Sequence, residues 1–196
     1  MNQIPNILSI FRIILAPIFF IFIISDTKEL VIISFFLYIL AAFSDYLDGF
    51  LARKLNAISS FGNFFDPLAD KILTSFAFIA FVIKDITPLW MVIIVIIRDL
   101  VTTLLRIYKL ENTKGLITSK LAKWKTFLQM LFIFFIITWI TTYYLFPDFI
   151  NFSLYIKVLK SEFLDYSMLL LTLLSVYSLL DYVINIIKRS KYSTKN

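Results

Sequence analysis

Four aspartates in two closely spaced pairs are the residues of this chain best suited to chemistry. Asp45 and Asp48 are three residues apart, and Asp66 and Asp70 are four apart. On a helix, either spacing places both side chains on the same face. A short connection between two such helices makes them antiparallel neighbours, so both pairs meet at one end. Four neighbouring carboxylates repel one another unless cations neutralise them, and the spacing therefore predicts a cation site.

The chain contains no Cys and no His, so the ligands of this site must be oxygen atoms. Carboxylate oxygens suit Mg²⁺ or Mn²⁺, and a cluster this rich in acids has room for two ions. Asp45, Asp48, Asp66 and Asp70 are the expected metal ligands. As an alternative, the aspartates cap helices or pair with nearby Arg and Lys side chains. That alternative accounts for one acid at a helix end, but not for two facing pairs.

The elements that hold these aspartates are expected to lie in a membrane. The chain is 60% hydrophobic and 16% charged, whereas soluble domains are about half apolar and a quarter charged. Apolar runs of membrane-spanning length recur along the sequence. The pattern predicts an all-α integral membrane protein, a single domain over residues 1–196, with residues 1–7 at the interface before the first helix. Six transmembrane helices are expected at Leu8–Ile24, Leu30–Phe50, Leu68–Ile83, Pro88–Tyr108, Leu121–Leu145 and Leu164–Ile187.

The distribution of Lys and Arg predicts the orientation. Only Lys28, Lys84, Lys157 and Lys160 fall on one side, and the other basic residues gather at or near the opposite helix ends. Because basic ends stay in the cytosol, both termini and the aspartates are expected there, in a multi-pass protein of a bacterial cytoplasmic membrane. The net charge of +6 then reflects orientation and anionic membrane lipids. No nucleic-acid partner is expected, because the chain has no soluble basic domain.

The stretch from Asp45 to Asp70 reads DYLDGFLARKLNAISSFGNFFDPLAD. It resembles the signature of the CDP-alcohol phosphotransferases, D-x-x-D-G-x-x-A-R, eight residues, then G-x-x-x-D-x-x-x-D. The resemblance implies a six-helix membrane fold with a cytosolic active site, a homodimer, and two divalent ions on the four aspartates. It also implies that Asp70 is the base that deprotonates the acceptor hydroxyl. The residues that match the family's CDP-binding positions are Asp45, Gly49, Ala52, Arg53 and Gly62.

Cationic residues beyond the signature predict a site for a phosphorylated acceptor. Arg98 and Arg106 lie on one face of the fourth predicted helix, and Lys123 and Lys125 open the fifth on the same side. Two arginines with lysines form a cradle suited to phosphate. In the alternative interpretation, Arg98 pairs with Asp99 or Asp181, and the lysines only set the topology.

Residues 4–19, 98–106 and 123–129 further resemble the branch of the family that makes phosphatidylglycerophosphate. This implies CDP-diacylglycerol as donor, glycerol 3-phosphate as acceptor and CMP as leaving product. It places Arg98, Arg106, Lys123 and Lys125 near the acceptor's phosphate. Related branches use phosphatidylglycerol, inositol phosphate or serine instead. Two alternatives belong to a different class of function: a cation transporter and an interaction protein. A transporter needs acidic residues near the middle of the membrane, whereas the four aspartates are expected at one end of the bundle.

Overall fold

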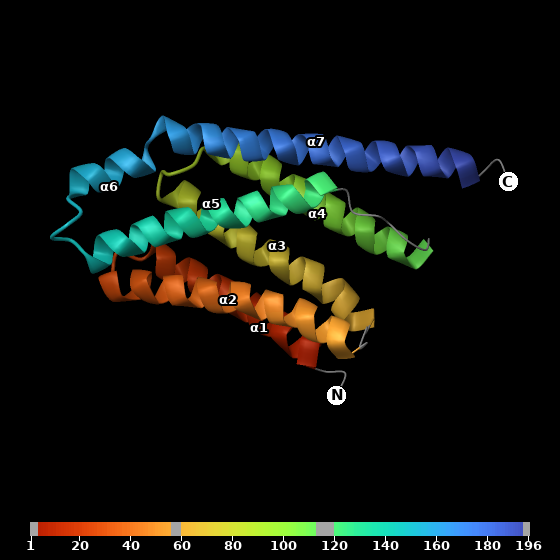
Figure 1. Ribbon diagram of the computed structural model, residues 1–196, viewed down its shortest axis with the longest axis horizontal. Helices are drawn as coiled ribbons and strands as arrows, with labels where there is room; N and C mark the ends of the chain where they lie inside the picture. Colours follow the sequence, from red (N-terminus) through yellow and green to blue (C-terminus); the bar gives the residue numbers. More distant parts are fainter. Residues whose placement is uncertain (1–3, 56–59, 113–119, 194–196) are drawn as a thin grey trace.

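A computed structural model describes the backbone of residues 4–55, 60–112 and 120–193, and the side chains of residues 9–44, 68–69, 71–105 and 123–184. Within these ranges the chain is helical and contains no strand, which confirms the predicted all-α class. Figure 1 shows the helices as a single elongated bundle. They are α1 (Ile4–Ile24), α2 (Lys28–Leu55), α3 (Ser60–Ile83), α4 (Leu89–Asn112), α5 (Lys120–Leu145), α6 (Phe152–Leu159) and α7 (Glu162–Ser193).

The six long helices match the six predicted ones, but several run further than their apolar cores. α2 continues to Leu55, α3 begins at Ser60, and α4 continues to Asn112. Helical hydrogen bonding does not require apolar side chains, so residues with good helix propensity, such as the Leu, Ala, Arg and Lys at the end of α2, extend α2 and α4 beyond the hydrophobic windows. Residues 4–7, expected to precede the first helix, form the first turn of α1.

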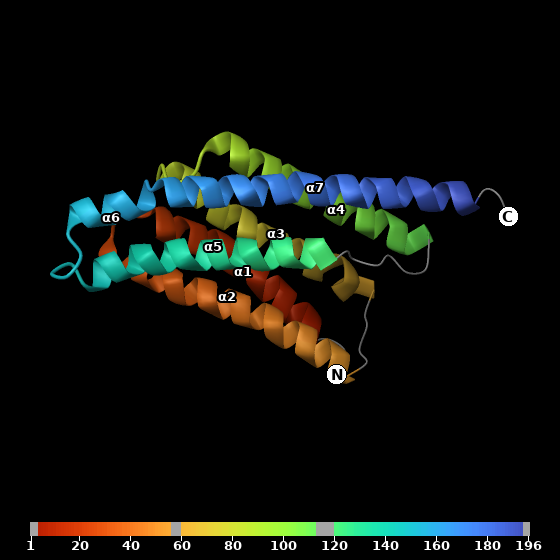
Figure 2. The same ribbon diagram turned by 45° about the horizontal axis from the view of Figure 1, so that its top comes forward.

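The connection between α5 and α7 contains the short helix α6. Asn151 caps its N-terminus, because the Asn151 side chain accepts a hydrogen bond of 2.8 Å from the Leu154 backbone N–H. Trp139 of α5 donates its indole N–H to the Tyr155 carbonyl oxygen at 3.3 Å. In both views, α6 lies at the end of the bundle opposite the ends of α2 and α4 (Figures 1 and 2).

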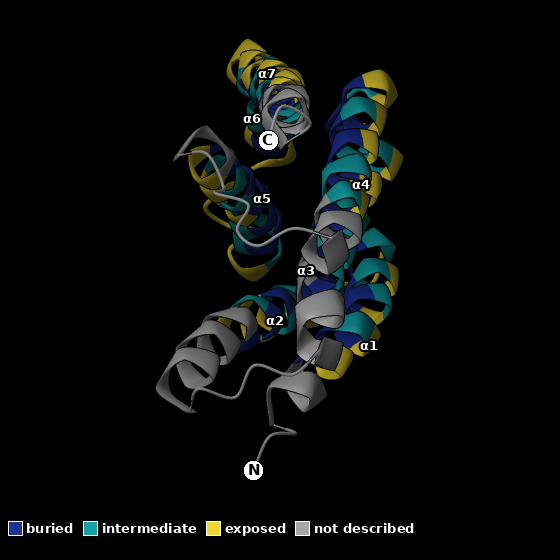
Figure 3. Ribbon diagram, turned by 90° about the vertical axis from the view of Figure 1, so that its right-hand side faces the viewer, coloured by how far each residue is buried: buried dark blue, intermediate teal, exposed yellow. Residues whose placement is uncertain are grey.

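The helices pack in two groups that meet along α2 and α3. α1 packs against α2 and α3, while α4 packs against α7 and α3, and α5 against α2 and α7. Figure 3, which views the bundle along its length, shows α1–α3 below α4, α5 and α7. Small residues let the backbones of the first group approach closely. The fully buried alanines of this group are Ala16, Ala41, Ala69, Ala77 and Ala80.

The outer surface of the bundle is apolar. Large hydrophobic side chains such as Phe36, Leu104, Leu131 and Leu173 are exposed on different helices. In water so much exposed apolar surface is unfavourable, but in a bilayer it contacts lipid. Among the described residues, Lys123–Leu145 and Phe152–Ile184 are long and apolar enough by themselves to span a membrane, and Ser9–Ile24 and Lys71–Ile83 are shorter apolar helices. These features agree with the integral membrane class.

Candidate active site

The two aspartate pairs lie on consecutive helices at one end of the bundle. Asp45 and Asp48 belong to the second half of α2, and Asp66 and Asp70 to the first half of α3. The helical backbone preserves the spacings of three and four that put each pair on one face. The end of α2 and the start of α3 lie at the same end of the bundle in both views (Figures 1 and 2). The side-chain positions of the four aspartates, and of Gly49, Ala52, Arg53, Gly62 and Arg106, lie outside the described residues.

A buried polar cluster joins α4, α5 and α7. We call it the Arg98 cluster; its members are Arg98, Asp99, Thr102, Lys125, Gln129, Ser175 and Ser178. At its centre the Asp99 carboxylate, whose residue is 3% exposed, forms salt bridges with Arg98 at 2.9 Å and with Lys125. A buried carboxylate is stable only when paired and hydrogen-bonded, and two cations meet that requirement here.

The Arg98 guanidinium uses most of its hydrogen-bonding capacity within the cluster. Its Nε donates to the Ser175 carbonyl oxygen at 3.2 Å, and its Nη2 donates to the Ser178 hydroxyl. Its Nη1 donates to Asp99 Oδ1 at 2.9 Å and to the Thr102 hydroxyl at 3.3 Å. A guanidinium has five N–H groups, so four of them have partners. Arg98 thereby links α4 to α7.

Lys125 and Gln129 approach the same carboxylate from α5. The Lys125 ammonium donates to Asp99 Oδ1, and the Gln129 side-chain amide donates to Asp99 Oδ2 at 3.4 Å. The two residues are four apart, so they occupy one face of α5. Both are buried, and the Gln129 side-chain carbonyl oxygen has no hydrogen-bond partner among the described residues. A buried acceptor atom without a partner is uncommon and is available to a ligand or a water molecule.

The Arg98 cluster lies close to the helix that carries the second aspartate pair. Lys71 directly follows Asp70 on α3, and its charge acts on both Asp99 and Lys125. Electrostatic interactions of this kind weaken with distance, so Lys71 lies near the cluster. The backbone of Asp70, next to Lys71 on α3, is therefore near the cationic residues Arg98 and Lys125.

Of the four cations predicted to bind an acceptor, Arg98 and Lys125 are buried and meet at Asp99, whereas Lys123 is exposed. Sequence reasoning had left the Arg98–Asp99 pair open as an alternative, and this pair is present. It did not identify Ser175 or Ser178. Their signal is weak, because serines three apart on an apolar helix can equally bond their own helix, as the Ser175 hydroxyl does to the Leu171 carbonyl oxygen.

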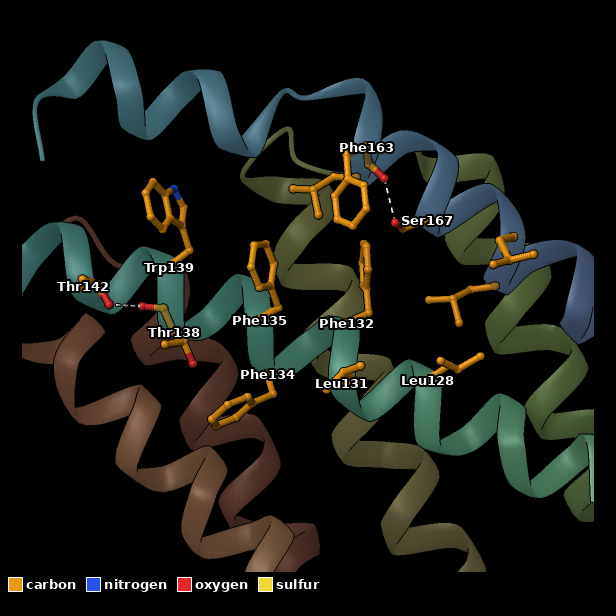
Figure 4. A pocket seen from close by; sticks show the side chains of 13 residues that line it. Leu128, Leu131, Phe132, Phe134, Phe135, Thr138, Trp139, Thr142, Phe163 and Ser167 are labelled. Atoms are coloured by element: carbon orange, nitrogen blue, oxygen red, sulfur yellow. Dashed lines mark hydrogen bonds between the residues drawn. The ribbon is translucent and has the colours of Figure 1, made fainter.

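An apolar cavity of about 560 Å³ lies between α5 and α7. It begins at Leu128, next to the cluster residue Gln129, and extends to Thr142. Figure 4 shows the rings of Phe132, Phe135 and Trp139 rising from α5 toward Phe163 of α7. Thr138, Thr142 and Ser167 also line the cavity, but the Thr142 and Ser167 hydroxyls donate to carbonyl oxygens of their own helices. Its walls therefore offer little to a charged ligand.

Acidic pairs and a buried cationic cluster within an apolar helical bundle define an integral membrane enzyme rather than a soluble one. The sequence profile of the CDP-alcohol phosphatidyltransferase family matches residues 2–161. The chain therefore belongs to the CDP-alcohol phosphatidyltransferase family, as the aspartate signature predicted. The family is generally dependent on divalent metal ions, which agrees with the all-oxygen donor set of the four aspartates.

Curated bacterial relatives carry one common name, CDP-diacylglycerol–glycerol-3-phosphate 3-phosphatidyltransferase. The relative from Mycoplasma genitalium is 37% identical over 68% of this chain, and the aligned part covers 64% of that protein. The Bacillus subtilis relative is 37% identical over 67% of this chain and 74% of its own length. The relative from Wigglesworthia glossinidia brevipalpis is 40% identical over 72% of this chain and 79% of its own length.

Proposed function

We propose that this protein transfers the phosphatidyl group of CDP-diacylglycerol to glycerol 3-phosphate, giving phosphatidylglycerophosphate and CMP. The names of the relatives support this reaction, and so does the aspartate signature on α2 and α3. The observation that carries the proposal is the complete aspartate signature on the consecutive helices α2 and α3, with Lys71, the neighbour of Asp70, near enough to Asp99 and Lys125 for its charge to act on both. A base and a phosphate-binding group must lie close together if one bound acceptor is to touch both.

The four aspartates are proposed to hold two divalent ions, Mg²⁺ or Mn²⁺. Asp45, Asp48, Asp66 and Asp70 supply only carboxylate oxygens, the donor type these ions prefer. When bound, such ions neutralise phosphate oxygens and stabilise the charge on the leaving CMP. The residues at the CDP-binding positions of the signature, Gly49, Ala52, Arg53 and Gly62, bind the nucleotide part of the donor.

Asp70 is proposed to act as the general base. As the hydroxyl oxygen of the acceptor forms a bond to the phosphorus on the lipid side of the pyrophosphate, its proton passes to the Asp70 carboxylate. The bond from that phosphorus to the bridging oxygen breaks, and the electron pair leaves with CMP. Arg53 lies on α2 where its fixed positive charge stabilises the phosphates. The step consumes only the donor and the acceptor, and metal ions that assist it would be retained.

The phosphate of the acceptor is proposed to bind the cations of α4 and α5, namely Arg98, Arg106, Lys123 and Lys125. Arg98 and Lys125 are already buried together, which supports a binding region between these helices. The orientation proposed from the Lys and Arg distribution places this site and both termini in the cytosol. The lipid tails of the donor then stay in the bilayer, and two copies of the chain form a homodimer.

The purified protein in detergent tests this reaction. CMP release is measured with CDP-diacylglycerol and Mg²⁺ in the presence of glycerol 3-phosphate, phosphatidylglycerol, inositol phosphate or serine. We expect release that depends on glycerol 3-phosphate. Stimulation by another acceptor alone would contradict the proposed acceptor but keep the chemistry. No release with any acceptor, with either Mg²⁺ or Mn²⁺, would contradict an enzyme of this type and favour a cation transporter.

A further inference from the structure

The hydrogen bonds of the Arg98 cluster divide its two cations into different roles. Four of the five N–H groups of Arg98 have protein partners on α4 and α7. A substrate phosphate would have to displace those partners from a residue that is only 6% exposed. The geometry therefore makes Arg98 a fixed element of the protein framework, which leaves it little capacity for a ligand.

Lys125 differs from Arg98 in its remaining donors. Among the described residues, its ammonium donates to Asp99, which leaves two of its three N–H groups for other partners. Lys125 is 1% exposed, and a buried ammonium with unused donors is unfavourable until an acceptor reaches it. An oxygen-rich anion supplies such acceptors.

The charges of the cluster also fit a phosphate. Within the cluster, Arg98 and Lys125 carry two positive charges against the single negative charge of Asp99. The excess positive charge favours a phosphate monoester, which carries close to two negative charges at neutral pH. The unpartnered Gln129 carbonyl oxygen lies on the same face of α5 and can accept a hydrogen bond from an alcohol hydroxyl.

We propose that Arg98 and Asp99 are positioning residues: Arg98 fixes the Asp99 carboxylate, and Asp99 holds the Lys125 ammonium so that its remaining N–H groups bind the acceptor's phosphate. This inference rests on the proposed function and refines it for two of the four cations: Lys125 contacts the phosphate, and Arg98 acts through Asp99 instead of contacting it. Ser178 acts at the far end of the same chain of contacts, since its hydroxyl accepts from Arg98 Nη2.

A double-mutant cycle tests the arrangement. Lys125→Met is expected to raise KM for glycerol 3-phosphate by at least about tenfold, because a charge-assisted bond to the phosphate is lost. Asp99→Asn should raise the same KM by a smaller factor, with KM for CDP-diacylglycerol changed less than about twofold. Adding Asp99→Asn to Lys125→Met should then cause little further loss, because the two residues act as one unit. Asp99→Glu, which keeps the negative charge, should raise KM for glycerol 3-phosphate less than Asp99→Asn does.

The proposal would be overturned if the KM increase of the double variant equalled the product of the two single increases. Equal changes in KM for glycerol 3-phosphate and CDP-diacylglycerol in the single variants would also overturn it. Ser178→Ala provides a test that keeps every charge, and it should raise KM for glycerol 3-phosphate by about two- to tenfold. Its matched control is Thr172→Val on the same helix, where a buried hydroxyl donates only to the Met168 carbonyl oxygen. An equal effect of both α7 variants would contradict the role of Ser178.

These outcomes are separable from failure of the proposed function. If the unaltered protein releases no CMP with glycerol 3-phosphate, the proposed reaction itself is wrong. If it does so but the cycle is additive, the reaction stands and the positioning role of Asp99 fails. Size-exclusion elution of each variant in detergent, compared with that of the unaltered protein, shows that the bundle has folded.

Discussion

Arg98 and Asp99 are neighbours in sequence on α4, yet the Arg98 Nη1 atom lies 2.9 Å from the Asp99 Oδ1 atom. Consecutive residues on a helix do not normally face each other. The pair forms because the long Arg98 side chain is held by α7 on one side, while Lys125 reaches the same carboxylate oxygen from α5. One carboxylate therefore connects three helices, and its removal should affect both stability and acceptor binding.

Removal of this carboxylate should destabilise the protein. Asp99→Ala leaves the buried Arg98 and Lys125 charges without their anion, and breaking a buried ion pair costs about 3–5 kcal/mol. We expect a clear fall in the unfolding temperature of the detergent-solubilised protein. Asp148→Ala is the matched control, because Asp148 is exposed in the α5–α6 connection. Equal unfolding temperatures for the two variants would show that the cluster does not stabilise the bundle.

Loss of the proposed base should stop turnover without unfolding the protein. Asp70→Asn keeps the size of the side chain but removes a carboxylate that accepts the proton, so CMP release should fall at least about a hundredfold. The unfolding temperature and much of the CDP-diacylglycerol binding should be retained. Asp148→Asn makes the same chemical change at an exposed position, and it should leave the rate unchanged. Retained turnover in Asp70→Asn would exclude Asp70 as the base.

Arg106 should influence the acceptor more than the donor. Arg106→Ala removes a cation proposed to contact the acceptor's phosphate, so KM for glycerol 3-phosphate should rise about tenfold or more. KM for CDP-diacylglycerol should change much less. Lys160→Ala, at an exposed cation that follows α6, serves as the control. An equal loss for both substrates would argue against an acceptor cradle on α4.

The proposed orientation can be tested because the chain contains no Cys. A single cysteine introduced by Asp148→Cys should react with a membrane-impermeant maleimide in intact cells. One introduced by Ser193→Cys, at the end of α7, should react only after the cells are opened. The reverse pattern would contradict the cytosolic placement of the site, which rests on the Lys and Arg distribution.

The sequence predicts the long helices of this bundle well, because membrane-length apolar runs leave few alternatives for the backbone. It does not predict α6, whose eight residues give no clear periodic pattern but are fixed by the Asn151 cap and by Trp139. The polar ends of α2, α3 and α4 were also missed. A hydropathy window identifies the apolar core of a helix and stops where polar residues begin.

The candidate site could also be predicted only in part from the sequence. Spacing alone predicted the aspartate pairs and the cationic residues of α4 and α5. It did not choose between a ligand role and an ion pair for Arg98, because that depends on which side chains of other helices approach it. Ser175 lies 77 residues from Arg98 and Ser178 lies 80 residues from it, so no local pattern connects them.

The most direct test of the central claim compares the two products. Protein in detergent receives CDP-diacylglycerol, Mg²⁺ and radiolabelled glycerol 3-phosphate; released CMP and label in the extracted lipid are then measured together. We predict equal molar amounts of CMP and labelled phosphatidylglycerophosphate, and neither product when EDTA removes the metal ion. CMP release without labelled lipid, or label incorporation that is indifferent to EDTA, would contradict metal-dependent phosphatidyl transfer to glycerol 3-phosphate.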